Sequence, residues 1–158
     1  MKFNGTEIKP NVVWVVIPRN PLDITIEINC LTQQDYEAFD ELVEEPTPPQ
    51  MMKPGGVTDV DRSDPGYLSA LADKSRRRTA YIYLKSLEKS ALEFEKARLA
   101  DPETWCDVFQ ELEDTFGQAE TAKIMEGILA ANGLDGDKIE EATQAFLAYL
   151  SLEENPLT

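Results

Sequence analysis

Residues 44–65, EEPTPPQMMKPGGVTDVDRSDP, decide how this chain is divided. Five of the chain's ten prolines and a Gly-Gly pair lie in this stretch. Because proline fixes φ and lacks a backbone N–H, the stretch is neither an ordinary helix nor a central strand. A loop of this length inside a compact domain is usually functional or a linker. We therefore predict a β-sheet plus helix subdomain over residues 1–45, a Pro/Gly-rich linker or arm over 46–64, a helical bundle over 65–152 and a frayed tail over 153–158.

The part before this stretch shows the patterns of β-strands. Asn4-Gly5 is a preferred pair for a two-residue turn, which predicts a short hairpin over residues 2–9. The run of Val, Trp and Ile in residues 11–17 predicts a buried strand. Alternation of isoleucine with polar residues in 24–30 predicts a strand with one buried face. Together these segments predict an antiparallel sheet of three or four strands.

One helix is predicted between the strands and the proline-rich stretch. Thr32 can cap the first turn, and Asp35 lies three residues later, as in a capping box. The helix ends before Pro46. We expect this helix to close the open face of the sheet.

The residues after the proline-rich stretch have helical spacing. Asp64-Pro65 is a capping residue followed by proline at the first helical position, which predicts a long helix to about Glu88. The segment 89–100 fits either an extended piece or a continued helix. An apolar stripe at positions i, i+3, i+4, i+7 and i+11 then predicts a helix that Gly117 stops. The stripe consists of Trp105, Val108, Phe109, Leu112 and Phe116.

Two more helices are predicted towards the end of the chain. One ends at Asn132-Gly133, and the last is expected to be capped by Asp135. The apolar face of the last helix consists of Ile139, Ala142, Phe146, Tyr149 and Leu150. With short turns between them, the helices predict a small bundle. The expected fold class is α+β.

Charge and composition limit the partners. The formal net charge is −15, which disfavours direct binding to nucleic acid or to an anionic membrane. No apolar run approaches the roughly 20 residues that cross a bilayer. The first residues lack the apolar core of a signal peptide, so we expect a cytoplasmic location. In that compartment Cys30 and Cys106 are expected to be reduced, buried thiols.

The sequence offers few residues in patterns suited to catalysis or metal binding. The chain has no histidine, the commonest general acid or base and metal ligand near neutral pH. Asp59, Asp61 and Asp64 suggest a calcium loop, but the sixth position lacks glycine and the twelfth is Ala70 rather than an acid. A phosphate loop, zinc-ligand spacing and a nucleophile elbow are all missing, and Cys106 has no histidine to activate it. We predict no enzymatic activity and no catalytic, cofactor-binding or metal-binding residues.

Six residues are candidates for contacts with a partner: Met51, Met52, Arg76, Arg77, Arg78 and Trp14. The methionines lie between prolines and suit adaptable apolar contacts, or they form a strap on the helical body. The arginines cover all sides of a helix, and they either pair with acids of this chain or dock an acidic partner or neighbouring subunit. The tryptophan lies in the middle of a very apolar strand and belongs either to the core or to an interface.

The order of motifs along the chain resembles a known family. The motifs are LVEEP (42–46), PP (48–49), KPGG (53–56), DPGY (64–67), YLKSLE (83–88), DPETW (101–105), ILAANGL (128–134), EEA (140–142) and FL (146–147). They resemble small acidic tail assembly chaperone-like proteins of long-tailed, siphovirus-type bacteriophages, which coat the tape-measure protein while the tail tube polymerises. The resemblance covers nearly the whole chain. Its motifs mark turns and the ends of helices rather than catalytic groups, so the resemblance implies no catalytic residue in this chain.

The resemblance implies a non-enzymatic protein that binds and solubilises the tape-measure protein, or another tail component, in the cytoplasm of the host cell. We also expect a homo-oligomer. A helical body, adaptable apolar contacts and a negative charge that opposes aggregation are compatible with this function. Two alternatives stay open, and the charge and the small size suggest the first of them. One is an acidic inhibitor or nucleic-acid mimic that blocks a basic site on a host defence protein, and the other is a structural virion component.

Overall fold

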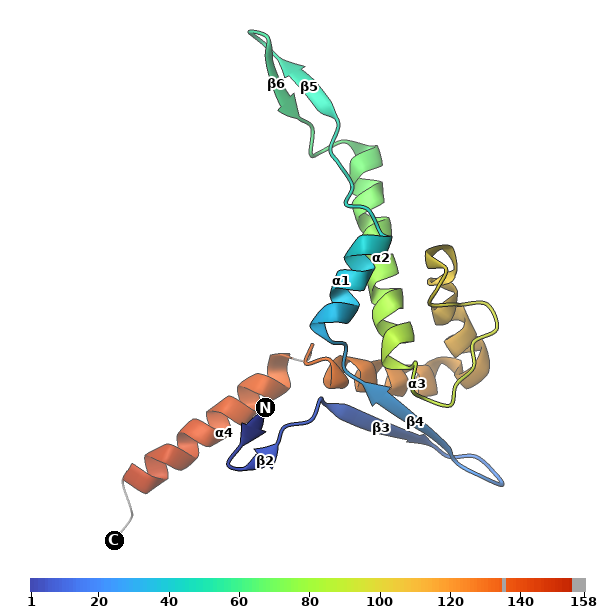
Figure 1. Cartoon of the computed structure of the whole chain (residues 1–158), viewed down its shortest axis with the longest axis vertical. Coiled ribbons are helices and arrows are strands. Elements are labelled where there is room, and N and C mark those ends of the chain that lie inside the picture. Colours follow the sequence, from blue (N-terminus) through green and yellow to red (C-terminus); the bar gives the residue numbers. More distant parts are fainter. Residues whose placement is uncertain (135, 155–158) are drawn as a thin grey trace.

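The computed structural model describes residues 1–134 and 136–154, and this part of the chain is α+β, as the sequence predicts. The described residues form three antiparallel sheets of two strands each, four α-helices and one short 3₁₀ turn (Figure 1). In chain order they are β1 (Lys2–Phe3), β2 (Thr6–Glu7), β3 (Val12–Ile17), β4 (Ile24–Asn29), α1 (Gln33–Leu42), β5 (Gln50–Lys53), β6 (Val57–Val60), α2 (Pro65–Ser86), η1 (Pro102–Thr104), α3 (Asp107–Ala131) and α4 (Gly136–Glu154).

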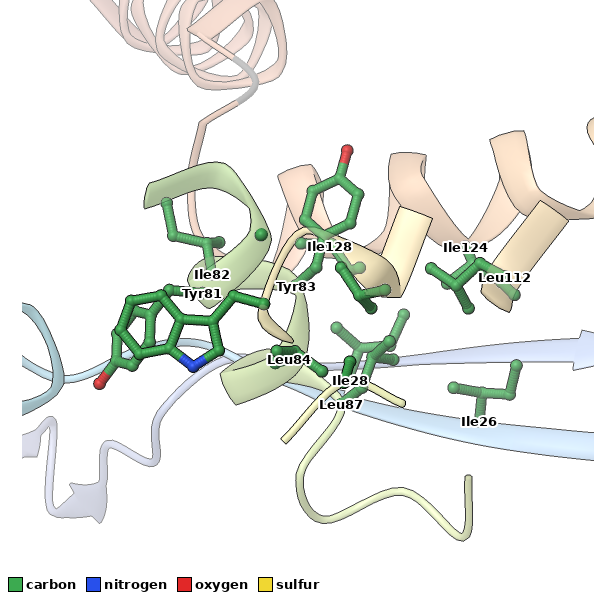
Figure 2. Close-up of a cluster of buried hydrophobic side chains, with 14 of the residues drawn as sticks. Ile26, Ile28, Tyr81, Ile82, Tyr83, Leu84, Leu87, Leu112, Ile124 and Ile128 are labelled. Carbon is green, nitrogen blue, oxygen red and sulfur yellow. The ribbon is translucent and has the colours of Figure 1, made fainter. Parts of the chain in front are cut away.

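The hydrophobic core lies where the β3–β4 hairpin, the C-terminal part of α2 and α3 meet (Figure 2). β4 contributes alternate isoleucines to it, because successive side chains of a strand point to opposite faces. Every buried residue of α2 lies in its last seven positions. The largest fully buried side chains are Trp105, Phe39, Ile26, Ile28, Leu87, Leu112, Ile124 and Ile128.

The expected sheet of three or four strands is wrong. β1 and β2 pair only with each other around the predicted Asn4-Gly5 turn, where both residues have positive φ, and β3 pairs with β4 in a separate sheet. The strands of the first hairpin are two residues long and fully exposed. Such short strands offer little backbone for further pairing, and Pro10 removes one donor from the connection to β3.

The expectation that the helix beginning at Thr32 closes the sheet is also wrong, because α3 covers the β3–β4 sheet (Figure 1). Gly127 makes this possible. A Cβ at Gly127 would lie 2.8 Å from Ile28 Cδ1 and 2.9 Å from Val15 Cγ2. The missing side chain therefore lets the α3 backbone approach the sheet closely.

α1 instead packs along α2. Its N-terminus has the predicted capping box between Thr32 and Asp35. Phe39 of α1 lies with its ring centroid 5.5 Å from that of Tyr81 and 5.9 Å from that of Trp105. The Tyr81 hydroxyl donates a hydrogen bond of 2.8 Å to the backbone oxygen of Asp35. The aromatic cluster thus joins α1, α2 and the start of α3.

α3 contains the break that the sequence predicts at Gly117. This glycine has φ 72° and ψ −180°, and helical residues continue on both sides of it. Across the break, the Thr121 hydroxyl donates to the backbone oxygen of Leu112 at 3.1 Å. Four members of the predicted stripe, from Trp105 to Phe116, are buried, and Phe109 is partly buried.

Asn132 joins three segments at the end of α3. Its Oδ1 accepts a hydrogen bond of 2.8 Å from the backbone N–H of Leu31. Its Nδ2 donates to the buried Ser86 hydroxyl at 2.9 Å and to the Ile128 carbonyl at 2.8 Å. Asn11 Nδ2 donates to the Ala130 carbonyl at 3.2 Å. These bonds hold the C-terminal end of α3 beside the start of β3 and the end of β4.

The ambiguous segment 89–100 is irregular, and a carboxylate of α3 holds its middle part. Glu111 of α3 accepts backbone hydrogen bonds from Glu95, Lys96 and Ala97 at 2.7, 3.0 and 2.9 Å. Burial by itself would raise the pKa of Glu111, but these three N–H donors outweigh it and lower the pKa. The carboxylate replaces the helical or strand hydrogen bonds that these three amides lack.

α4 does not join the other helices in the predicted bundle. Every α4 side chain that the structure describes is exposed, and Figure 1 shows the helix lying apart from the core. The bundle predicted for residues 65–152 is therefore wrong for its last helix. The cap expected at Asp135 lies outside the described residues, and so do residues 155–158 of the predicted tail.

Candidate protein-interaction surfaces

The proline-rich stretch forms a β-hairpin, which we call the arm and define as residues 50–60. Its strands β5 and β6 pair in register, with Met51 opposite Asp59 and Met52 opposite Thr58. Gly55 and Gly56 form the turn, both with positive φ. Sequence analysis missed this hairpin, although Gly-Gly between two strand-like runs is a recognised hairpin signal.

The arm projects from the molecule. Figure 1 shows it beyond the N-terminal end of α2, whose first half lies outside the core. A backbone hydrogen bond of 2.8 Å from Asp61 to Pro49 closes its base, and Lys53 Nζ lies 2.6 Å from Asp59 Oδ2 near its tip. A two-stranded hairpin gains little stability by itself. Among the described residues no third strand pairs with β5 or β6, so the arm offers free strand edges and exposed side chains to a partner.

Both candidate methionines are exposed on the arm, which excludes the strap on the helical body. Met52 is 79% exposed and Met51 is 39% exposed. Val57 on the facing strand is exposed as well. Methionine is unbranched and polarizable, so it adapts to apolar surfaces of different shapes.

The three candidate arginines make contacts within this chain. Arg77 forms ion pairs with Asp73 (3.2 Å) and Glu103 (3.4 Å). Arg76 lies over the ring of Phe109 with 5.9 Å between the guanidinium carbon and the ring centroid. Arg78 lies in the same way over Tyr36, at 5.2 Å, and over Phe39. Acid pairing therefore accounts for one arginine, and cation–π contacts hold the other two against α1 and α3.

Trp14 lies on an uncovered face of the β3–β4 sheet. It is 61% exposed, and Val12 and Val16, two residues to either side, are exposed on the same face. We call these three residues the outer face of β3. The alternate residues Val13, Val15 and Ile17 point to the face that packs on α3. Of the two locations predicted for Trp14, the structure excludes the core.

α4 carries an apolar stripe, which we define as Ile139, Ala142, Phe146, Tyr149 and Leu150. All five residues are exposed, and Phe146 is 58% exposed. The acids Asp137, Glu140 and Glu141 cluster in the first turns, whereas residues 142–152 carry no charge. Most of the stability of a helix in a protein comes from packing of its apolar face against a neighbour, so an exposed stripe of this kind favours a covering surface.

The exposed area of the whole chain is large. The accessible surface is 11587 Å². A compact monomer of this mass exposes about 8,000 Å², so roughly 3,600 Å² is in excess. The arm, the outer face of β3 and α4 account for much of the exposed apolar part.

Groups suited to chemistry or to metals are not gathered in the described residues. A hollow of about 250 Å³ between residues 92–96 and 111–116 contains Glu111, whose carboxylate is already bound to backbone amides. Burial raises the pKa of the half-buried Cys106 thiol, which disfavours the reactive thiolate. Among residues 1–134 and 136–154 no group of three His, Cys, Asp or Glu could hold a metal ion. Nor does any described helix have the length and apolar character to cross a bilayer.

Comparison of the chain with protein-family models, with curated proteins and with solved structures found no match.

Proposed function

We propose that this protein is a non-enzymatic assembly chaperone of a long-tailed phage, which binds the tape-measure protein and keeps it soluble during tail assembly. The observation that carries the proposal is the arm, a projecting hairpin with two exposed methionines at neighbouring positions. The motif order described above supplies the phage context, and the arm supplies a physical means of binding.

The arm suits a long, helical and partly apolar client. Met51 and Met52 point to opposite faces of β5, so the arm presents a flexible apolar side chain on each face. Contacts of this kind tolerate different client sequences, because methionine repacks easily. The arm is joined to the rest of the chain at one end only, so a client can bind it without disturbing the core.

The charge supports the same function. Each bound chaperone brings a net charge of −15 to the client. Coated filaments therefore repel one another, which opposes their aggregation. Carboxylates are distributed over α1, α3 and α4, which point in different directions in Figure 1. A nucleic-acid mimic needs its acids in a spaced array on one surface, so this distribution favours the chaperone over the mimic.

Co-expression with the tape-measure protein of the same genome tests the proposal. We expect the wild-type chain to co-purify with the tape-measure protein and to raise its soluble fraction. Replacing both arm methionines (M51E and M52E together) should abolish both effects, whereas the matched control (M51L and M52L together) should retain them because it keeps the apolar surface.

Two results would contradict this function. One is a wild-type chain that neither co-purifies with the tape-measure protein nor improves its solubility. The other is the presence of the protein in mature particles, because a chaperone leaves before the virion is complete and a structural component does not.

A further inference from the structure

Two uncovered apolar surfaces of this chain complement each other: the outer face of β3 and the α4 stripe. We propose that α4 of one copy packs on the outer face of β3 of a second copy, and that the reciprocal contact forms a homodimer. Each copy then supplies one helix and receives one. In this two-fold arrangement both contacts are made within the dimer, so no further copies are added.

The two surfaces are both apolar, and they are similar in length. A sheet is stabilised by a covering layer on an apolar face. This sheet already has α3 on its inner face, and its outer face is apolar along β3, whereas β4 contributes Thr25, Glu27 and Asn29 there. β3 has six residues and is about 20 Å long at roughly 3.3 Å per residue. The α4 stripe from Ile139 to Leu150 is about 17 Å long at 1.5 Å per residue. One helix therefore covers one strand almost from end to end.

The helix cannot come from the same copy. α3 lies on the inner face, so a helix on the outer face lies two layers away, about 20 Å from the axis of α3 at roughly 10 Å per layer. Backbone hydrogen bonds from Gly133 to Ala130 (3.3 Å) and from Leu134 to Leu129 (3.0 Å) hold the chain at the end of α3. From Leu134 to Gly136 the chain spans at most about 7 Å. The start of α4 therefore lies too close to α3 for this helix to pack lengthwise on the outer face of its own copy.

The exposed area favours a second copy as the occupant. An excess surface of roughly 3,600 Å² per chain exceeds the approximately 1,600 Å² that a standard interface buries in total. Both complementary surfaces are present in every copy, so self-association needs no further component. Trp14 and Phe146 would then lie near the centre of each contact, where aromatic residues contribute most to binding.

Charge gives the interface a characteristic salt response. Each copy carries −15, and Glu27 lies opposite Trp14 on β4, so association brings like charges together. Salt screens the repulsion between charges that lie farther apart than the Debye length, which is about 10 Å at 0.1 M and about 3 Å at 1 M salt. The dimer should therefore be tighter in 500 mM than in 50 mM NaCl, the reverse of an interface that joins opposite charges.

Sedimentation of the purified full-length chain tests the proposal without any tape-measure protein, so its outcome is independent of the proposed function. We expect a concentration-dependent dimer. Phe146→Asp should raise the dissociation constant by about 30-fold or more, the loss typical of a central aromatic residue. Trp14→Thr, which keeps a strand-forming residue, should do the same. The matched control Gln144→Asp places the same new charge on the opposite side of α4 and should leave the dimer intact.

Quenching of tryptophan fluorescence by acrylamide gives an independent readout. Trp105 is 0% exposed and is protected in any case, so the quenchable signal comes from Trp14. In the dimer, Trp14 should become protected as the protein concentration rises. Protection at every concentration would mean closure within one copy and would overturn the proposal. A monomer at 100 μM, or a dimer that Phe146→Asp leaves unchanged, would overturn it as well.

Discussion

Replacing Gly127 by alanine tests the close packing of α3 on the β3–β4 sheet. The new Cβ would lie 2.8 Å from Ile28 Cδ1 and 2.9 Å from Val15 Cγ2, closer than carbon atoms pack without displacement. Ile28 is fully buried, and Val15 is β-branched with a restricted χ1. Neither side chain can move away freely, so the helix and the sheet have to separate slightly.

Two opposing terms set the size of the effect. Alanine is a better helix former than glycine by about 1 kcal/mol, which stabilises the folded state. Adding a methyl group to a filled core costs about 1–3 kcal/mol. We expect Gly127→Ala to lower the free energy of unfolding by about 1 kcal/mol. For a chain of this length, the melting temperature should fall by about 2–4 °C.

Urea unfolding followed by circular dichroism and by Trp105 fluorescence measures this change. Gly136→Ala is the matched control, because it makes the same change in α4 where a Cβ meets nothing within 4 Å, and its stability should equal that of the wild type or exceed it by up to about 1 kcal/mol. In the double variant with Val15→Ala, the two changes should compensate by at least about 0.5 kcal/mol. Wild-type or higher stability of Gly127→Ala, with no coupling to Val15, would refute the close approach.

Three further predictions follow from the described contacts. The three N–H donors lower the pKa of Glu111 below its ordinary value of 4.5, so its stabilisation is complete above about pH 5 and is lost as the pH falls further; the stability difference between wild type and Glu111→Gln in urea should therefore shrink from pH 7 to pH 3. Asn132→Ala leaves the Leu31 amide and the Ser86 hydroxyl without their partner and should cost about 2 kcal/mol in the same assay. Deleting residues 47–60 should keep the melting temperature within about 2 °C by circular dichroism, because the arm lies outside the core and a change of loop length costs little free energy, and it should abolish binding of the tape-measure protein.

Local signals predicted the elements well. The Asn4-Gly5 turn, the Thr32 capping box and the break at Gly117 all occur where the sequence places them. Each depends on φ preferences or on hydrogen bonds between residues at most three apart, so a short stretch of sequence suffices. The arm is not predicted from the sequence, because the prolines of residues 44–65 argue against a helix or a central strand, whereas the strands β5 and β6 contain no proline and belong to a two-stranded sheet.

The candidate interaction residues were only partly predictable. Exposed methionines on an arm were one of two alternatives, and the structure selects that one for Met51 and Met52. An interface role for Trp14 stays a prediction, now with an exposed side chain to support it. The partners of Arg76 and Arg78 could not be predicted, because the rings that they cover come from α1 and α3 and are distant in sequence.

The sequence by itself determined where α1 and α2 begin, the Asn4-Gly5 turn and the break at Gly117, and that the chain is acidic and lacks histidine. Only the tertiary structure decided which helix covers the sheet and which helix is left without a partner. Both α3 and α4 are amphipathic, so periodicity does not distinguish them. Gly127 allows α3 to approach the sheet, and the short connection after Leu134 prevents α4 from packing lengthwise on the opposite face of its own copy. Side-chain volume and chain length between distant segments set that outcome, and neither is visible in a local pattern.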